Sequence, residues 1–402
     1  LRISQTAGAS LLPAGIAPES AALDYGLGRI GMDQIAAGGF GDVSLYARDL
    51  LTFDGDVTLQ ARQSISLYQG ALGNTRAGAT VRIIAPYVLL SGRTNLTPAI
   101  VQQVEATLNA WKPSTLPGAA LFEVDADQID IRNRVNAGMS GAARLGGGSQ
   151  LAIERRGYDN VALRSRGDLR FLATAGATDI PISGQSDTSA VLTAGNLLLA
   201  GQRVYPATGA KGLAVAGWRG GGVPYDADAV LRIEGVAGPQ AGVAPLSVFG
   251  ALTLNAPNVE QGGNVFAPLG RIVMGIGING DTRQVRLLPG SLTSVSAAGL
   301  TVPYGGTVDG LSYLYQGVPV EAVGVGGMSV FGVMRGISLL GGSIAVDAGA
   351  VIDLSGGGTL AGAAFVSGRG GSTDPLFHPL PPFDAAGGKF DLPALAGRPV
   401  YA

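Results

Sequence analysis

The sequence predicts an all-β protein built on a right-handed parallel β-helix, a solenoid in which one chain winds into stacked coils. Gly supplies 65 of the 402 residues, about twice its usual share, and charged residues supply only 14%. Short segments with alternating apolar side chains recur along the chain. Asn-Gly, the strongest hairpin signal, occurs once, at Asn279-Gly280, so an up-and-down barrel is the weaker alternative.

The repeated unit is a pentad: Gly, a small or polar residue, an apolar residue, any residue, and a second apolar residue. It predicts a turn that leads into a strand with alternate side chains inward. It occurs at Gly41, Gly55, Gly167, Gly195, Gly250, Gly270 and Gly342. Three short strands per coil would use roughly 20 to 25 residues, which predicts about 15 or more coils and a length on the order of 70 Å. Asn255, Asn258 and Asn264 stand where strands end and are expected to form ladders between coils.

Three segments are expected along the chain. Residues 1–37 are an irregular lead-in or the first coils, 38–373 are the shaft, and 374–402 are a Pro/Gly-rich tail leading to the next part of a parent chain. One helix, near residues 98–111, is expected within an insertion at 97–112. Thr97 is its N-cap, Pro98 occupies the first helical position, and the apolar face is Ile100, Val104, Leu108 and Trp111.

Composition excludes several classes of function. The net charge of −2 and a pI of about 5.5 leave no basic surface for a phosphate backbone, so no nucleic-acid partner is expected. The chain has no Cys, which excludes disulfides and thiol chemistry. The most apolar stretch, Ala322 to Met334, is broken by Gly and too short for a membrane-spanning helix. The chain begins without a signal peptide, and we expect a piece of a longer protein.

Carboxylates offer the strongest hint of chemistry. Asp54 and Asp56 flank Gly55, and other acids cluster at Asp125, Asp127 and Asp130 and at Asp226 and Asp228. In a strand-turn-strand reading Asp54 and Gly55 form the turn and Asp56 opens the next strand, a structural role. A glycosidase would need two carboxyl groups about 5 to 9.5 Å apart across a cleft. A β-helix polysaccharide lyase or hydrolase is therefore the enzymatic alternative.

The other motifs give weaker evidence for a functional site. His378 is the single His, so a Ser-His-Asp triad and a His-based zinc site are not expected. G-x-G-x-x-G begins at Gly26 and at Gly275, but strand-like sequence follows the second, and only a short stretch follows the first before Gly38-Gly39. Trp218 and Tyr225 could stack on sugars, although loop anchoring is the more ordinary role. No catalytic, cofactor-binding or metal-binding residue, and no cofactor, is expected.

Five motifs occur in order along the chain. They are GGFGDVSLYARDLLTFDGDVTLQARQSISLYQG from Gly38, YPATGA from Tyr205, NAPNVEQGGNVFAPLGRI from Asn255, LLPGSLTSVSAAGLTVPYGGTVDG from Leu287 and VIDLSGGGTLAGAAFVSGRGGSTDP from Val351. Together they resemble the filamentous-haemagglutinin-like exoproteins of Gram-negative bacteria. The resemblance implies a very long virulence-associated surface protein, secreted through an outer-membrane β-barrel transporter of the two-partner secretion pathway.

That resemblance implies that this chain is a later part of the shaft, secreted or at the bacterial cell surface. The expected function is structural and adhesive, not enzymatic, with loops presented to host or neighbouring cells and glycans as candidate ligands. Beside the polysaccharide enzyme, a second alternative is a self-assembling extracellular fibre, in which copies associate end to end or laterally.

Overall fold

The computed structural model describes residues 1–8, 28–47, 50–92, 120–144, 151–174, 188–218, 228–275, 282–308, 312–315, 318–319 and 335–363. The expected helix at 98–111 and the tail at 374–402 lie outside these residues. The chain forms two compact units, Leu1–Ala298 with Arg335–Gly357, and Gly299–Met334 with Gly358–Ala402.

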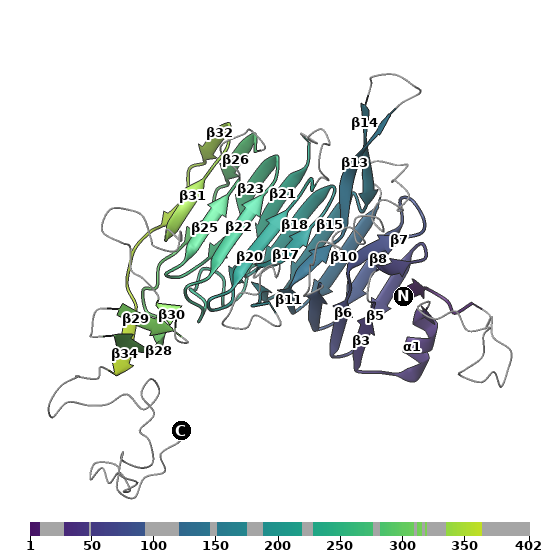
Figure 1. The fold of residues 1–402 in the computed structure, drawn as a ribbon, viewed down its shortest axis with the longest axis horizontal. Coiled ribbons are helices and arrows are strands. Elements are labelled where there is room, and N and C mark those ends of the chain that lie inside the picture. The colour runs from purple at the N-terminus through teal and green to yellow at the C-terminus, as the bar shows by residue number, and fades with distance from the viewer. Residues whose placement is uncertain are drawn as a thin grey trace, which may run out of the picture. The chain divides into compact units, whose positions relative to one another are not determined.

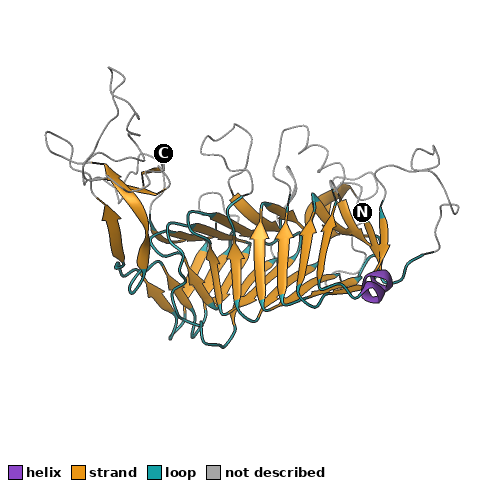
Figure 2. Cartoon of the chain, turned by 90° about the horizontal axis from the view of Figure 1, so that it is seen from below, coloured by secondary structure: helices purple, strands orange, loops and turns teal. Residues whose placement is uncertain are grey.

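The first unit is a parallel β-helix, as predicted (Figure 1, Figure 2). The coils pass in turn through three sheets, here called sheets 1, 2 and 3, except that residues 236–250, between β21 and β22, contribute no strand to sheet 1. Sheet 1 contains β3 (Asp42–Tyr46), β6 (Ser64–Tyr68), β9 (Tyr87–Ser91), β11 (Gln128–Arg132), β16 (Asp168–Phe171), β19 (Arg203–Pro206), β24 (Asn264–Phe266), β27 (Leu292–Ser294) and β33 (Val351–Asp353).

Sheet 2 is divided into two parts. The first part contains β2 (Arg29–Gly31), β1 (Arg2–Ser4), β4 (Leu50–Phe53) and β7 (Ala71–Asn74). The second part contains β12 (Arg134–Asn136), β17 (Thr188–Leu192), β20 (Lys211–Val215), β22 (Ala251–Asn255), β25 (Arg271–Met274) and β31 (Gly336–Leu339).

Sheet 3 runs the length of the unit without a break. It contains β5 (Val57–Gln60), β8 (Thr80–Ile84), β10 (Leu121–Ala126), β15 (Asn160–Ser165), β18 (Asn196–Gly201), β21 (Val230–Gly235), β23 (Asn258–Gly262), β26 (Gln284–Leu287) and β32 (Ser343–Val346). All pairs within the three sheets are parallel, so the hydrogen bonds between strands run from coil to coil.

The described solenoid has fewer coils than the sequence predicted. Sheets 1 and 3 have nine strands each, which corresponds to a stack of about 40 Å. The number of coils is lower in part because some described strands belong to none of the three sheets. The antiparallel pair β13 (Gly138–Arg144) and β14 (Leu151–Gly157) follows β12 and projects from the solenoid in Figure 1.

The core consists of apolar columns that run along the solenoid. In sheet 3 the parallel register places one inward side chain of each strand on its equivalent in the next coil. The first eight members of this column are at most 2% exposed. The column is Val57, Val81, Phe122, Val161, Leu197, Leu231, Val259, Val285 and Ile344. Burial of such columns is the main stabilising term of the fold.

The glycines of the pentads serve close packing more than turn geometry. Gly55 has a φ of +80°, but the other six pentad glycines are not among the residues with positive φ. A Cβ on Gly195 would lie 1.9 Å from the carbonyl oxygen of Asp159, and one on Gly270 would lie 1.9 Å from the carbonyl oxygen of Gly250. These glycines let adjacent coils approach each other at the point where a strand begins.

Gly195→Ala is therefore expected to destabilise the solenoid by about 1–3 kcal/mol, because the new methyl group meets backbone that must shift. Gly41→Ala is the matched control, since the first contact of its Cβ is the flexible Gln63 side chain at 3.2 Å. The control should change the free energy of unfolding by less than about 0.5 kcal/mol. Urea unfolding of the two variants measures the difference, and equal midpoints would contradict the packing role.

The expected asparagine ladder forms, but with other residues. Asn255, Asn258 and Asn264 do stand at strand ends. The Asn258 side chain donates to Ala229 O and that of Asn264 to Gln202 O, so both bond to backbone of an adjacent coil. The side-chain ladder is instead Asn196 to Asn160, 3.0 Å, and the Asn196 side-chain oxygen also accepts from the Val230 N–H at 3.0 Å. Which Asn stacks on which depends on coil register.

The first residues form a coil and a helix. β1 pairs with β2 and β4, so the segment expected to be a lead-in or first coils includes a coil. Helix α1 (Met32–Gly38) follows β2, and the sequence reading did not foresee it. The Gly31 N–H donates to Gln34 Oε1 at 3.1 Å, and Gly39, with a φ of 63°, ends the helix. Met32 and Ile35 face the core.

The second unit interrupts the range 38–373 that the sequence assigned to the shaft. Its described strands are β28 (Thr301–Val308), β29 (Ser312–Tyr315), β30 (Val318–Pro319) and β34 (Thr359–Ala363). β29 pairs antiparallel with β28 and β30, whereas β34 pairs parallel with β28. This mixed sheet belongs to none of the three solenoid sheets.

Candidate functional site

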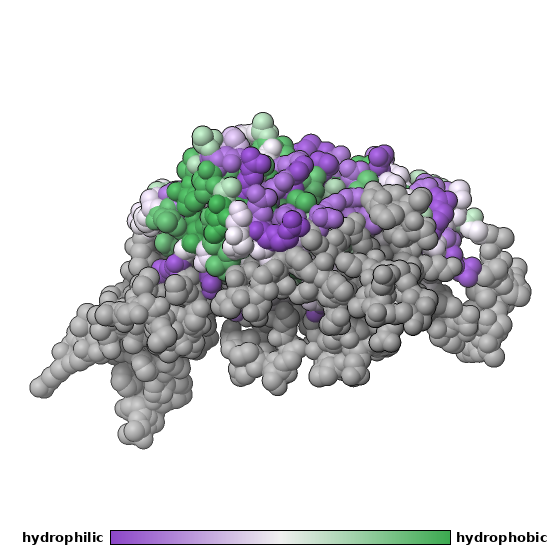
Figure 3. Space-filling view, turned by 90° about the horizontal axis from the view of Figure 1, so that it is seen from above, coloured by the Kyte–Doolittle hydropathy of each residue, from purple (hydrophilic) through white to green (hydrophobic). Residues whose placement is uncertain are grey.

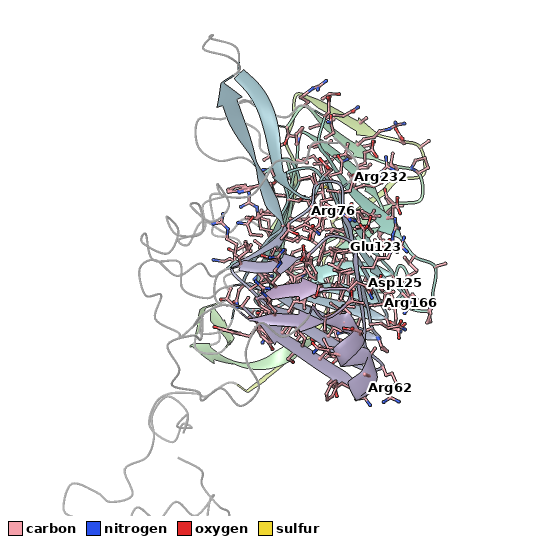
Figure 4. All side chains as sticks on the ribbon, turned by 90° about the vertical axis from the view of Figure 1, so that its right-hand side faces the viewer. Arg62, Arg76, Glu123, Asp125, Arg166 and Arg232 are labelled. Atoms are coloured by element: carbon pink, nitrogen blue, oxygen red, sulfur yellow. The ribbon has the colours of Figure 1, made fainter. Side chains whose placement is uncertain are left out.

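The outer face of sheet 3 carries a ladder of opposite charges. Arg82 and Glu123 occupy paired positions on adjacent strands, with Arg82 Nε 3.2 Å from Glu123 Oε2. Arg164 Nε lies 3.4 Å from Glu123 Oε1, and Arg232 Nη2 lies 2.6 Å from Glu260 Oε2. Figure 4 shows Glu123, Asp125, Arg166 and Arg232 on one side of the solenoid. Exposed pairs of this kind contribute about 0–1 kcal/mol each.

Asp125, Asp127 and Asp130 do not form one site. Asp125 is the next-to-last residue of β10 on sheet 3, Asp127 lies in the turn, and Asp130 belongs to β11 on sheet 1. Asp125 and Asp127 share one partner, Arg166, whose Nε donates to Asp127 Oδ1 at 2.7 Å. Hydrogen bonding to Asp127 raises the pKa of Arg166. Each of these two carboxylates is thus paired with a guanidinium.

Asp54 and Asp56 have the structural role that the sequence favoured. Asp54 Oδ2 lies 2.9 Å from Arg2 Nη2, and its other oxygen accepts from the Thr75 hydroxyl. Asp56 accepts the Thr80 N–H at 2.8 Å and pairs with Arg76. The Thr75 bond is the main cause that lowers the pKa of Asp54, and the Thr80 N–H is the main cause for Asp56. A lowered pKa is opposite to what a general acid needs near neutral pH.

Sheet 1 holds a partly buried ionic cluster, defined here as Tyr87, Asp130, Arg170, Asp168, Arg203 and Tyr205, of which Asp130 and Tyr205 are buried. Asp130 is 2% exposed and accepts two hydrogen bonds from Arg170, each 2.8 Å, and one from the Tyr87 hydroxyl at 2.9 Å. Arg203 likewise donates twice to Asp168, at 2.8 and 2.6 Å, and the Tyr205 hydroxyl donates to Asp168 at 2.8 Å. Two units of acid, arginine and tyrosine thus lie on the same sheet. They differ in the tyrosine, since Tyr87 comes from the strand β9 before Asp130, whereas Tyr205 shares the strand β19 with Arg203.

This cluster was not predicted from the sequence. In the sequence, Asp130 stands out only as one of the acids near Asp125, and Asp168 only as the second residue of the pentad at Gly167. The outward position of both follows from strand alternation, which is a signal in the sequence. Their partners do not follow, because Arg170 is 40 residues from Asp130 and the length of the intervening excursion sets the register.

The stability of the protein is expected to fall at alkaline pH in part through Tyr87. Burial, and then the charge of Asp130, raise the pKa of Tyr87 to about 12, above the value of 10.0 expected without burial. Its contribution is therefore fully present below about pH 10 and is lost as the pH rises through about 12. Urea midpoints between these pH values should fall less in Tyr87→Phe than in the wild type. Parallel pH profiles would contradict this assignment.

The remaining residues singled out in the sequence do not form a common site in the described part of the chain. Trp218 is packed against Ala190, Leu192 and Val215, and the Arg134 guanidinium lies 5.2 Å from its ring centroid. This supports the ordinary anchoring role. Tyr225, Asp226 and His378 lie outside the described residues, whereas Asp228 lies just before β21.

The motif from Gly26 does not make a phosphate loop. Its last three residues are strand β2, and the short stretch behind it is α1, so a helix does open there. That helix has only 7 residues. Asp33 Oδ1 accepts the N–H groups of Ala7 and Gln34 at this end, where a phosphate would otherwise bind. Of the motif from Gly275, only Gly275 itself is described.

Two further kinds of feature are absent from the described part of the chain. Among the residues with described placement, no group of three or more His, Asp or Glu side chains could hold a metal ion. In the same part of the chain, no helix is long and apolar enough to cross a membrane.

The fold and surface define a class: a parallel β-helix with ion-paired outer faces. No protein-family model matches the chain, and no curated protein or solved structure matches it.

Proposed function

We propose that this chain is a structural and adhesive shaft segment of a large secreted surface protein. One observation carries the proposal: Asp54, Asp56, Asp125, Asp127 and Asp130 are each held by an arginine, and they lie at several places on the solenoid. Paired acids of this kind stabilise coils, whereas a glycosidase needs two carboxyl groups facing each other across a cleft. The resemblance to filamentous-haemagglutinin-like exoproteins supports the same proposal, and the two-partner transporter and the cell-surface location come from it.

The polysaccharide enzyme is the function against which the proposal is tested. The purified protein is incubated with whole cells and with a glycan array, and release of reducing ends is measured on the same glycans. We expect retention on cells or glycans without release of sugar. Release at enzymatic rates, lost in Asp54→Asn with Asp56→Asn or in Asp125→Asn with Asp127→Asn, would overturn the non-enzymatic proposal. Absence of retention on any surface would overturn the adhesive part.

A further inference from the structure

Two neighbouring coils carry the same tripeptide on sheet 1. Ser-Leu-Tyr occurs at residues 44–46 in β3 and at residues 66–68 in β6. The parallel register aligns the two copies residue by residue, so Tyr46 is paired with Tyr68. Both leucines are buried in the core, and the tyrosines therefore lie side by side on the outer face of the sheet.

The two tyrosine rings are in contact with each other. Their centroids are 6.3 Å apart, and their planes are tilted by 37°. Among the described side chains, this is the one contact between two tyrosine rings. Tyr46 is 74% exposed, so its ring can rotate within nanoseconds and bring one edge against Tyr68. The carbons ortho to the hydroxyl groups lie at these edges.

The hydroxyl groups of this pair differ from those of the other described tyrosines. The Tyr87 and Tyr205 hydroxyls donate to carboxylates of the ionic cluster on sheet 1, and the Tyr158 hydroxyl donates to a backbone carbonyl at 3.2 Å. Within the described part of the chain, the hydroxyls of Tyr46 and Tyr68 make no hydrogen bond. The two phenols are therefore not used to hold coils together by hydrogen bonds.

The largest apolar area in view lies in another part of the solenoid. In Figure 3 the apolar residues (green) lie mostly at the end where Figure 1 places β31 and β32, whereas β3 and β6 lie toward the opposite end. Nothing in the described residues shows what covers that apolar area. The tyrosine pair needs no partner from outside the chain, because each ring can react with the other.

We propose that Tyr46 and Tyr68 form a site of oxidative cross-linking, where hydrogen peroxide and a one-electron oxidation catalyst join the two rings into dityrosine. Each phenol loses one electron and one proton and becomes a tyrosyl radical. The two radicals form one carbon–carbon bond between ring carbons ortho to the oxygens, and the hydrogen on each of these carbons moves as a proton to the phenolic oxygen. The two electrons and two protons removed at the start reduce one hydrogen peroxide to two water molecules.

The new bond takes the place of a disulfide in a chain that has no Cys. It closes a loop of chain between residues 46 and 68, which restricts the unfolded state as a disulfide does. Because β3 is the first strand of sheet 1 and β6 is the second, the bond holds an edge strand of the sheet to its neighbour. This inference rests on the geometry of the tyrosine pair and does not depend on the adhesive function proposed above.

Trypsin makes the site directly testable. Tyr46 is the single tyrosine of the tryptic peptide 30–48, and Tyr68 is that of the peptide 63–76. Treatment of the full chain with hydrogen peroxide and a haem peroxidase should join these two peptides, with a mass equal to their sum less two hydrogen atoms. Groups held in one molecule meet at an effective concentration of about 1 mM or more, so the yield at ~1 µM protein should not change on roughly tenfold dilution. Absence of the joined peptides, or their formation only between two chains, would overturn the proposal.

A matched variant separates this pair from the general reactivity of exposed tyrosines. Tyr68→Phe with Gln60→Tyr keeps the number of tyrosines, but residue 60 is exposed at the end of β5 on sheet 3. We expect no link between the peptides 30–48 and 49–62 in this variant. A link there with the same yield as between Tyr46 and Tyr68 in the wild type would contradict a site defined by the contact of the two rings.

Urea unfolding tests whether the bond stabilises the solenoid. The cross-linked wild type should have a higher urea midpoint than Tyr68→Phe treated with the same oxidant. Both proteins contain the same five methionines, so oxidation of Met affects them equally. Equal midpoints of the two treated proteins, with the link present in the wild type, would overturn the stabilising role of the bond.

Discussion

Phe122→Ala should lower the free energy of unfolding by about 3–5 kcal/mol, the largest effect that we expect from a single core substitution. Phe122 is 0% exposed and belongs to the apolar column of sheet 3. Its ring centroid lies 6.1 Å from that of Phe53 and 5.4 Å from that of Tyr158. Removal of the ring leaves a cavity in this cluster, and the rigid stacking of coils above and below limits collapse around it.

The conservative substitution Phe122→Leu should cost much less, since it keeps most of the volume. Tyr46→Ala is the matched surface control, because Tyr46 is an aromatic residue on an edge strand and is 74% exposed. Its effect should stay within about 0.5 kcal/mol. Urea unfolding followed by circular dichroism provides the comparison. A loss in Phe122→Ala no larger than that in Tyr46→Ala would contradict a continuous apolar column.

Asp130→Asn is expected to destabilise the protein by about 1–3 kcal/mol, because it weakens the hydrogen bonds of a side chain that is 2% exposed, while Arg170, 32% exposed, can still be solvated. Asp130 also accepts the Tyr87 hydroxyl, so three charge-assisted hydrogen bonds are weakened together. A double substitution, Asp130→Leu with Arg170→Leu, should recover part of the loss, since no charge is then left without its partner.

The exposed pair of Asp56 and Arg76 provides the control for this prediction. Their side chains are 62% and 61% exposed, and Asp56→Asn should cost about 0–1 kcal/mol. The same urea titration measures both variants, at a pH near 7 and at low and high salt. If Asp130→Asn and Asp56→Asn have equal effects, the cluster on sheet 1 does not stabilise the fold as its geometry indicates.

Local sequence patterns predicted most strands, but they did not predict helix α1 or the number of coils. The pentads at Gly41, Gly55 and Gly195 each lead into a parallel strand. These strands could be predicted because five residues are enough to show the alternation of apolar side chains. Helix α1 was missed because its 7 residues are too few to show helical periodicity. The number of coils was overestimated because the β13–β14 pair and the second unit use residues without adding a coil.

For the candidate acids, too, the local position could be predicted from the sequence, whereas the partners from other coils could not. That Asp56 stands next to a turn glycine and a strand could be predicted from Gly55 beside it, but the strand β5 begins one residue later, at Val57, and Asp56 belongs to the turn. That Asp130 meets Arg170 and Tyr87 could not be predicted, because each partner comes from a different coil. A one-residue change in register would turn these side chains to the other face of the sheet.

The sequence by itself determined the all-β class, the short strands and the apolar columns, because these depend on alternation and composition within a few residues. Only the tertiary structure decided which arginine holds which carboxylate, and which side chains of sheet 1 meet in the cluster around Asp130. Those features depend on contacts between coils that lie tens of residues apart, and their register is set by the excursions between strands.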